Sequence, residues 1–233
     1  KADQALKKKL IVKICQRENG WPVVRNLLFQ NGDIELATEV LKLLSGNKIL
    51  ALQEQPENCR AMLEIAAVFS GKDIWMRNLA VFNQRHKNSH QTLAQLNNFA
   101  APDSATLKRN ALHSIALIQR LQGHYKEAAA SSRLLYNSLL KNKEPNLQKS
   151  STNLLIDTHL HNKDYAWLET FWKNTPFKVE EHTRLTNILY LQKMQNKTAQ
   201  YKETLAKLDK IMNTKESYAQ LAKVLLVNAE VDK

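Results

Sequence analysis

The fold is decided by residues 21–41, which read WPVVRNLLFQNGDIELATEVL. Trp21, Val24 and Leu28 are spaced by three and four residues, so their side chains share one face of a helix. Gly32 then interrupts the apolar spacing, and glycine readily takes the left-handed conformation that ends a helix. The stretch therefore predicts a helix that stops at a tight turn.

A second helix is predicted directly after this turn. Ile34 is expected to fill the corner between the two helices, and the small side chain of Ala37 lets them approach closely. Leu41 then faces the shared core. The pair resembles a tetratricopeptide repeat, in which the pattern W-x2-L-G-x2-Y is followed by A-x3-F. Arg25 departs from that pattern, which has a small residue at this position.

The same kind of turn recurs along the chain. The further copies are Gly71-Lys72-Asp73-Ile74, Gln122-Gly123-His124-Tyr125, Asn162-Lys163-Asp164-Tyr165 and Lys197-Thr198-Ala199-Gln200-Tyr201. Ala116 and Ala128 supply the small residues on either side of the third turn. Recurrence of a turn within apolar helical spacing indicates stacked helix pairs, although the spacing here exceeds the ~34 residues of the family. The alternative is an irregular helical domain with short turns between helices.

The resemblance implies an all-α fold, a right-handed superhelical stack of antiparallel helix pairs. A basic helix at residues 1–17 is expected to cap or link, and residues 18–233 form the repeat domain. The expected units lie near 18–45, 58–84, 107–141, 150–174 and 183–212, with a closing helix at 214–229. Three polar, proline-containing stretches are predicted to be loops between helices: Arg85–Ser104, Asn142–Ser150 and Asn174–Glu181.

Composition agrees with helices and excludes several other classes. The chain has only five glycines and five prolines, too few for the closely spaced turns of a β-sandwich. No apolar run approaches the ~20 residues that a membrane-spanning helix needs. Lysine and arginine number 34 against 22 acidic residues, a net charge of +12. Such a charge suits an acidic partner, a nucleic acid, an anionic membrane surface or simply a solvated lysine-rich surface.

No catalytic or cofactor motif is present in the sequence. It has no H-E-x-x-H, no phosphate-binding glycine-rich loop and no G-x-S-x-G. His86 and His90 have the spacing of two metal ligands on one helix face, but they lie among cations without a nearby carboxylate. The sequence therefore predicts a protein that is not an enzyme and that needs no metal or cofactor.

The two cysteines, Cys15 and Cys59, match no zinc-site spacing. They read either as buried thiols in a reducing compartment or as a disulfide formed after export. The first methionine is Met62, so we expect Lys1 to lie inside a longer precursor or parent protein. A cytoplasmic location is favoured, with export as the alternative.

The expected role is to bind another protein or a peptide. Tetratricopeptide-like arrays have an inner groove lined by the first helix of each pair, and the resemblance places polar residues there. The candidates for partner contact are Asn110, His113, Arg120, Asn153, Asp157, Lys193 and Asn196. We expect the partner to lie around the third and fourth units, with the long linker before the third unit as an extra wall. RNA or DNA binding through the basic surface is the alternative.

Overall fold

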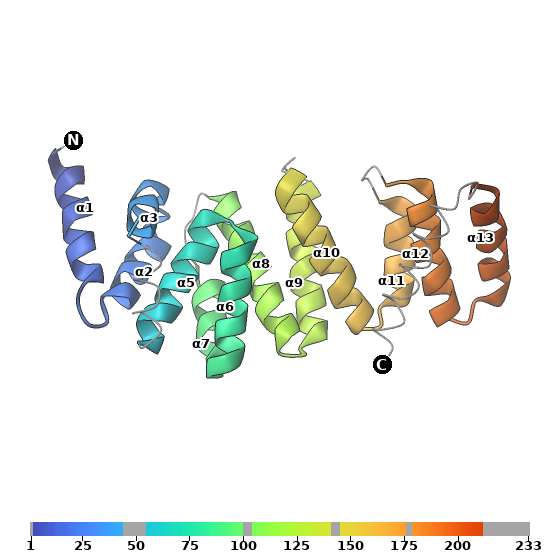
Figure 1. The fold of residues 1–233 in the computed structure, drawn as a ribbon, viewed down its shortest axis with the longest axis horizontal. Coiled ribbons are helices and arrows are strands. Elements are labelled where there is room, and N and C mark those ends of the chain that lie inside the picture. The colour runs from blue at the N-terminus through green and yellow to red at the C-terminus, as the bar shows by residue number, and fades with distance from the viewer. Residues whose placement is uncertain (1, 44–54, 100–103, 141–144, 176–178, 212–233) are drawn as a thin grey trace. The chain divides into compact units, whose positions relative to one another are not determined.

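The computed structural model describes residues 2–43, 55–99, 104–140, 145–175 and 179–211, and every regular element among them is an α-helix (Figure 1). The helices are α1 (Ala2–Cys15), α2 (Gly20–Asn31), α3 (Ile34–Leu41), α5 (Pro56–Ser70), α6 (Asp73–His86), α7 (Ser89–Asn97), α8 (Ala105–Leu121), α9 (Tyr125–Leu140), α10 (Pro145–His161), α11 (Tyr165–Asn174), α12 (Glu181–Met194) and α13 (Thr198–Ile211). The closing helix predicted at 214–229 lies outside the described residues.

The chain divides into two compact units, an N-terminal unit at 1–155 and a C-terminal unit at 156–233. Each is described by itself below. Helix α10 crosses the boundary, with its first part in the N-terminal unit. Helix α1 packs on α2 and α3 within the N-terminal unit.

All five predicted turns lie where two helices meet, and each of the first four contains one residue with a positive φ angle. At the fifth, this residue is Asn196, directly before the predicted stretch Lys197–Tyr201, most of which already belongs to α13. These residues are Gly32 (64°), Gly71 (63°), Gly123 (77°), Lys163 (58°) and Asn196 (55°). The left-handed conformation reverses the chain within a few residues, and glycine adopts it without strain. A turn with one residue in the left-handed conformation therefore joins α2 to α3, α5 to α6, α8 to α9, α10 to α11 and α12 to α13.

The expectation that Ile34 fills a corner is wrong, and the same holds for its counterpart Ile74. Their side chains are 50% and 58% exposed. Helix α3 buries Leu36, Ala37 and Val40 instead. Ile34 precedes Leu36 by two residues, which turns it about 200° away from the buried face of the helix.

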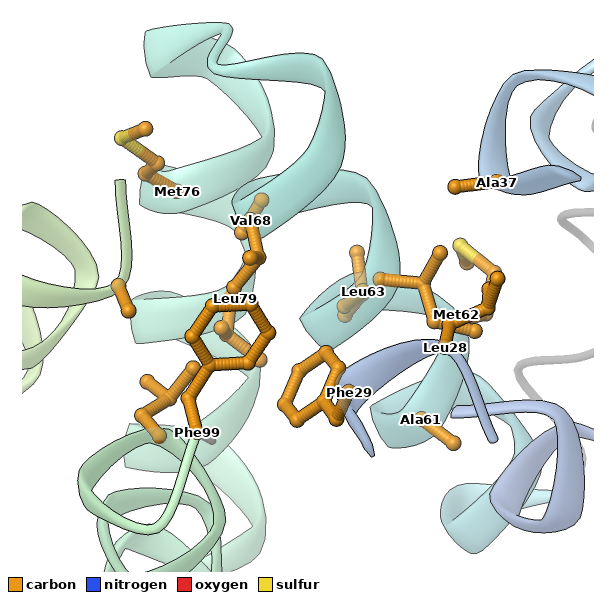
Figure 2. Close-up of a cluster of buried hydrophobic side chains, with 14 of the residues drawn as sticks. Leu28, Phe29, Ala37, Ala61, Met62, Leu63, Val68, Met76, Leu79 and Phe99 are labelled. Atoms are coloured by element: carbon orange, nitrogen blue, oxygen red, sulfur yellow. The ribbon is translucent and has the colours of Figure 1, made fainter. Parts of the chain in front are cut away.

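The core of the N-terminal unit is built around α5. Every residue from Asn58 to Val68 is buried, because α2, α3, α6, α7 and α8 all pack against this helix. Figure 2 shows Met62, Leu63 and Val68 of α5 among apolar side chains of the neighbouring helices. Helix α1 covers α2 and α3 with Ile11, while Lys7 and Lys8 form ion pairs with Asp33 and Glu35 on the edge of α3.

The linker predicted as a loop at Arg85–Ser104 contains helix α7. Ser89, Thr92 and Leu96 recur at helical spacing and are buried. Phe99 follows the helix, and its ring meets Phe29 edge to face at a centroid distance of 4.9 Å (Figure 2). Phe69 completes this aromatic cluster. The sequence does not reveal this helix because most of its residues are polar and its apolar stripe is short.

The linker predicted at Asn142–Ser150 is also partly helical, since α10 begins at Pro145. Proline suits the first position of a helix, because its missing N–H would have no partner there. The proline predicted as a loop residue is therefore the first residue of a helix.

In the C-terminal unit, α12 packs against α11 and α13. Leu185, Leu189 and Leu208 form a small apolar cluster with Tyr201.

A substitution at Ala128 tests the packing of α9 on α8. Its side chain is fully buried where these two helices meet. We expect Ala128→Trp to lower the free energy of unfolding by about 1–3 kcal/mol, because an indole cannot enter a packed contact without displacing its neighbours. Thermal denaturation followed by circular dichroism measures this. An unchanged melting temperature would show that the contact is not tightly packed, and Ala130→Trp, at an exposed position of α9, is the control.

Candidate interaction surfaces

The predicted partner-binding residues are divided between the two units. Four of them, Asn110, His113, Arg120 and Asn153, belong to the N-terminal unit, and Asp157, Lys193 and Asn196 belong to the C-terminal unit. Asn153, Lys193 and Asn196 are exposed, Arg120 and Asp157 are half-buried, and Asn110 and His113 are buried. The last two cannot line an open groove, which corrects the sequence-based placement.

Asn110 joins two helices of the core. Its Nδ2 donates a hydrogen bond to the carbonyl oxygen of Val68 at 2.7 Å. The amide also lies against the turn between α5 and α6, where a Cβ atom on Gly71 would come within 3.0 Å of Asn110 Nδ2. Asn110 therefore holds the end of α5 against α8, and this buried role could not be read from helical spacing alone.

His113 is buried between α6, α8 and the start of α10. Its Nε2 lies 3.7 Å from Asp73 Oδ1, and its Nδ1 lies 3.5 Å from Ser151 Oγ. Burial lowers the pKa of His113 to about 4, against the opposing effect of the Asp73 carboxylate, so the ring is neutral at pH 7. Serine, histidine and aspartate also form hydrolytic triads, but Ser151 is fully buried and no substrate can reach its hydroxyl.

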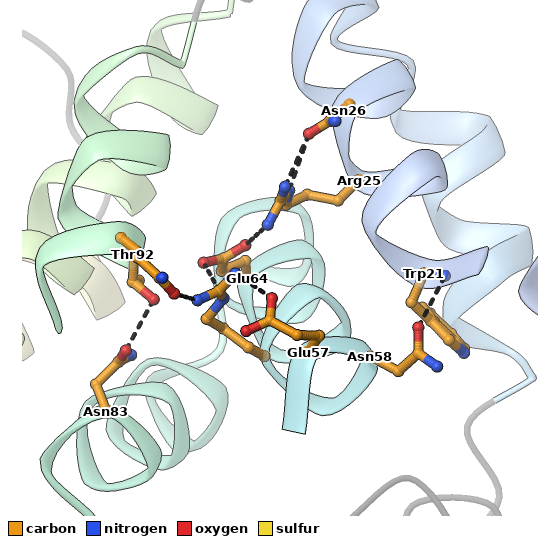
Figure 3. A network of polar contacts seen from close by, with 10 residues as sticks. Trp21, Arg25, Asn26, Glu57, Asn58, Glu64, Asn83 and Thr92 are labelled. Carbon is orange, nitrogen blue, oxygen red and sulfur yellow. Dashed lines mark hydrogen bonds and ion pairs between the residues drawn. The ribbon is translucent and has the colours of Figure 1, made fainter. Parts of the chain in front are cut away.

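A buried ionic network joins α2 to α5 (Figure 3). Arg25 NH1 and Glu64 Oε2 are 2.7 Å apart, and both side chains are shielded from solvent. Burial raises the pKa of Glu64, while the charge and hydrogen bond of Arg25 oppose that rise. Arg25 also donates from Nε and NH2 to Asn26 Oδ1. The residue that departs from the repeat pattern is thus paired with a carboxylate on the next helix pair.

Arg60 extends this network towards the surface. It contacts Glu57 and Gln91, and its Nε lies 3.8 Å from Glu64 Oε1. Gln91 is on α7, so the network ties the linker helix to α5. Sequence reasoning missed this set because an Arg or Glu inside a helix normally reads as a solvated residue.

The first candidate surface is the α1 groove. It is lined by Leu6, Lys8, Lys9, Leu10, Val12 and Lys13 of α1, by Gln16 directly after α1, by Glu39 of α3, and by Lys42 and Leu43 directly after α3. Its volume is about 610 Å³. Leu6 and Leu10 are 66% and 57% exposed and lie one helical turn apart. The groove therefore combines an uncovered apolar strip with a rim that is mainly cationic.

In the C-terminal unit, the carboxylate of Glu169 and the side chains that donate to it form a clasp. Glu169 of α11 is buried and accepts hydrogen bonds from Lys173 Nζ at 2.6 Å, Lys197 Nζ at 2.8 Å and Gln195 Nε2 at 3.0 Å. Desolvation of Glu169 raises its pKa, but these donors outweigh it and lower the pKa to about 2. The clasp joins α11 to α12 and to the turn before α13.

The second candidate surface is the α11–α13 groove. It is lined by Lys173, Glu181, Arg184, Leu185, Ile188, Gln192, Gln200, Glu203, Thr204 and Lys207, and its volume is about 410 Å³. Gln192 is only 3% exposed. Its Oε1 has no hydrogen-bond partner among the residues that the structure describes. This groove is polar, in contrast to the apolar strip on α1.

Neither cysteine is suited to act as a nucleophile, although Cys15 lines a pocket. This third pocket, of about 690 Å³, lies between the α1–α2 turn and the start of α5, and Trp21 also lines it. Both cysteines are free, buried thiols. Burial raises the pKa of Cys15 to about 11 and also raises that of Cys59, so neither forms the reactive thiolate readily at pH 7.

Within the described ranges, no group of three or more His, Cys, Asp or Glu side chains is placed to hold a metal ion. His86 ends α6 and stacks on Phe82, whereas His90 belongs to α7. No helix of the described part of the chain is both long and apolar enough to cross a membrane.

Comparison with known proteins found no match: no protein-family model, no curated protein and no solved structure is significantly similar to this chain. The resemblance to tetratricopeptide repeats thus stays a prediction from the sequence.

Proposed function

We propose that this chain is a non-catalytic module that binds another protein, and that its helix pairs stack into a tetratricopeptide-like superhelix. The observation that supports binding best is the α1 groove. Leu6 and Leu10 are large apolar side chains that the protein leaves uncovered next to each other. Covering a leucine side chain contributes about 1.5–3 kcal/mol when it is fully buried, so this strip can anchor a partner.

The charges around the strip favour an acidic amphipathic helix as the partner. Lys9 and Lys13 lie on α1 beside the leucines and line the groove. A helix with leucines on one face and glutamates on its flanks would place apolar side chains on Leu6 and Leu10 and carboxylates beside these lysines.

A nucleic acid suits this surface less well. Lys7, Lys8 and Lys42 are each paired with a carboxylate, at 3.3 Å from Asp33, 2.9 Å from Glu35 and 2.9 Å from Glu39 respectively. Phosphate binding depends on lysines and arginines whose charge is not already neutralised. Exposed leucines also contribute nothing to a phosphate backbone. The mixed charge with an apolar centre therefore supports protein binding over RNA or DNA binding.

Replacing the apolar strip tests the proposal. The probe is a synthetic 18-residue helical peptide with leucines on one face and glutamates on the other, with fluorescence anisotropy as the readout. We expect Leu6→Ser with Leu10→Ser to weaken binding at least tenfold, about 1.4 kcal/mol. The matched control is Leu134→Ser with Leu140→Ser, two exposed leucines of α9 in the same unit.

A scrambled peptide and a single-stranded RNA serve as controls for this binding experiment. A peptide of the same composition with scrambled order has no apolar face, and we expect it to bind more weakly than the amphipathic peptide. Equal binding to the parent protein and to the Leu6/Leu10 variant would contradict the proposal. So would tighter binding of a single-stranded RNA of similar length with a steep dependence on salt.

A further inference from the structure

We propose that a fourth pocket, between α5 and α6, binds a small aromatic carboxylate, with the ring beside Trp75 and the carboxylate on Arg85. The volume of this α5–α6 pocket is about 420 Å³. Sites for small molecules commonly measure about 300–1,000 Å³. The pocket lies in the N-terminal unit and shares no residue with the α1 groove, so the inference is independent of the proposed function.

The inner part of the pocket is apolar and aromatic. Cys59, Met62 and Leu63 of α5 are buried and form its floor, and the last two are drawn in Figure 2. Phe82 of α6 also lines the pocket, and the ring of His86 stacks on it at a centroid distance of 4.2 Å. Ring faces and edges together with sulfur atoms favour an aromatic ligand over an aliphatic one.

The outer part of the pocket carries hydrogen-bond donors that a ligand can reach. Trp75, Asn78, Phe82 and Arg85 follow one another at intervals of three and four residues, so they share one face of α6. Trp75 is half-buried, and Asn78 and Arg85 are exposed. The indole, amide and guanidinium groups of these three residues have no hydrogen-bond partner in the part of the chain that the structure describes. A ligand that accepts hydrogen bonds is therefore favoured.

The pocket has a cation but no carboxylate. Arg85 forms no ion pair with any residue of the described ranges, and no Asp or Glu lines the pocket. Burial raises the pKa of Cys59, so this residue stays an uncharged thiol at pH 7. The α1 groove and the α11–α13 groove, by contrast, each include at least one glutamate. A guanidinium binds a carboxylate through two parallel hydrogen bonds, so one carboxylate is the charge that this pocket matches.

The test uses the full chain at pH 7 with naphthalene-2-carboxylate as the probe and isothermal titration calorimetry as the readout. We expect a dissociation constant at or below about 1 mM, which well-matched ligands of this size reach. Naphthalene-2-carboxamide lacks the charge and hexanoate lacks the ring. We expect each of these two compounds to bind at least tenfold more weakly than the probe.

Two substitutions on α6 connect the binding to the pocket. Arg85→Gln removes the cation, and Asn78→Asp adds a negative charge at nearly the same volume. We expect each to weaken binding of naphthalene-2-carboxylate at least tenfold and to leave binding of the carboxamide unchanged. Arg77→Gln is the matched control, because Arg77 is exposed on the same helix, pairs with Asp73 and does not line the pocket. Circular dichroism verifies that the variants fold.

Four results would overturn the inference. The first is no binding of naphthalene-2-carboxylate at millimolar concentration. The second is an equal affinity for hexanoate, which would mean that the ring is not recognised. The third is equal binding by the parent and by Arg85→Gln. The fourth is binding that Leu6→Ser with Leu10→Ser abolishes, which would place the probe in the α1 groove.

Discussion

Glu64→Ala lowers the free energy of unfolding of the N-terminal unit by about 3–5 kcal/mol, the largest effect that we expect from a single substitution in this chain. The carboxylate of Glu64 is fully buried and lies 2.7 Å from Arg25 NH1. Its removal leaves the Arg25 guanidinium without its carboxylate in a place that water does not reach, and Arg60 loses a second nearby negative charge.

Chemical denaturation followed by circular dichroism measures this loss. Glu35→Ala is the matched control, because Glu35 is an exposed partner of Lys8 and such pairs contribute at most about 1 kcal/mol. The double variant Arg25→Leu with Glu64→Leu should recover much of the loss, since an apolar pair of similar volume removes both charges. A loss below about 1 kcal/mol for Glu64→Ala would show that water enters the network.

Glu169→Gln destabilises the C-terminal unit by about 3 kcal/mol at pH 7, the free energy that corresponds to a pKa lowered from 4.5 to about 2. A carboxylate with a lowered pKa stabilises the folded state fully above the pKa of the unfolded chain. That stabilisation is lost as the pH falls from about 4.5 towards 2. The difference between the parent and Glu169→Gln should therefore shrink over this interval.

Hydrogen exchange of the amides in α11–α13, measured at pH 7 and at pH 3, reports the local stability of this unit. Glu203→Gln provides the comparison, because Glu203 is exposed and pairs only with Lys207 among the described contacts. If Glu169→Gln protected these amides as well as the parent at pH 7, the clasp would not stabilise the unit.

Sequence reasoning succeeded where the decisive signal is local. The turns at Gly32, Gly71 and Gly123 combine a glycine with a break in apolar spacing, and both cues lie within a few residues. Ala37 and Ala128 are buried as their small size suggests. Helix periodicity identifies such positions because it needs only the residues of one helix.

Sequence reasoning failed where a polar residue is buried by a partner far along the chain. Arg25 and Glu64 meet across two helix pairs, and neither reveals the other from its own neighbours. The spacing of α8 predicts that Asn110 lies in an open groove, opposite the apolar stripe, but α8 has neighbours on more than one side and buries it. Similarly, Gln192 stands out only when its unpaired oxygen is known.

The aromatic cluster of Phe29, Phe69 and Phe99 has a consequence for how the protein is made. The first two rings leave the ribosome well before the third, because Phe99 follows α7. Until then, apolar surface on α2 and α5 stays open to other chains or chaperones. In the C-terminal unit, the described packing joins α11 to α12 and α12 to α13, helices that are consecutive in the chain. Such local packing forms quickly. During synthesis, the core of the N-terminal unit therefore stays incomplete until Phe99 has emerged, whereas each described helix of the C-terminal unit can pack as soon as the next one is made.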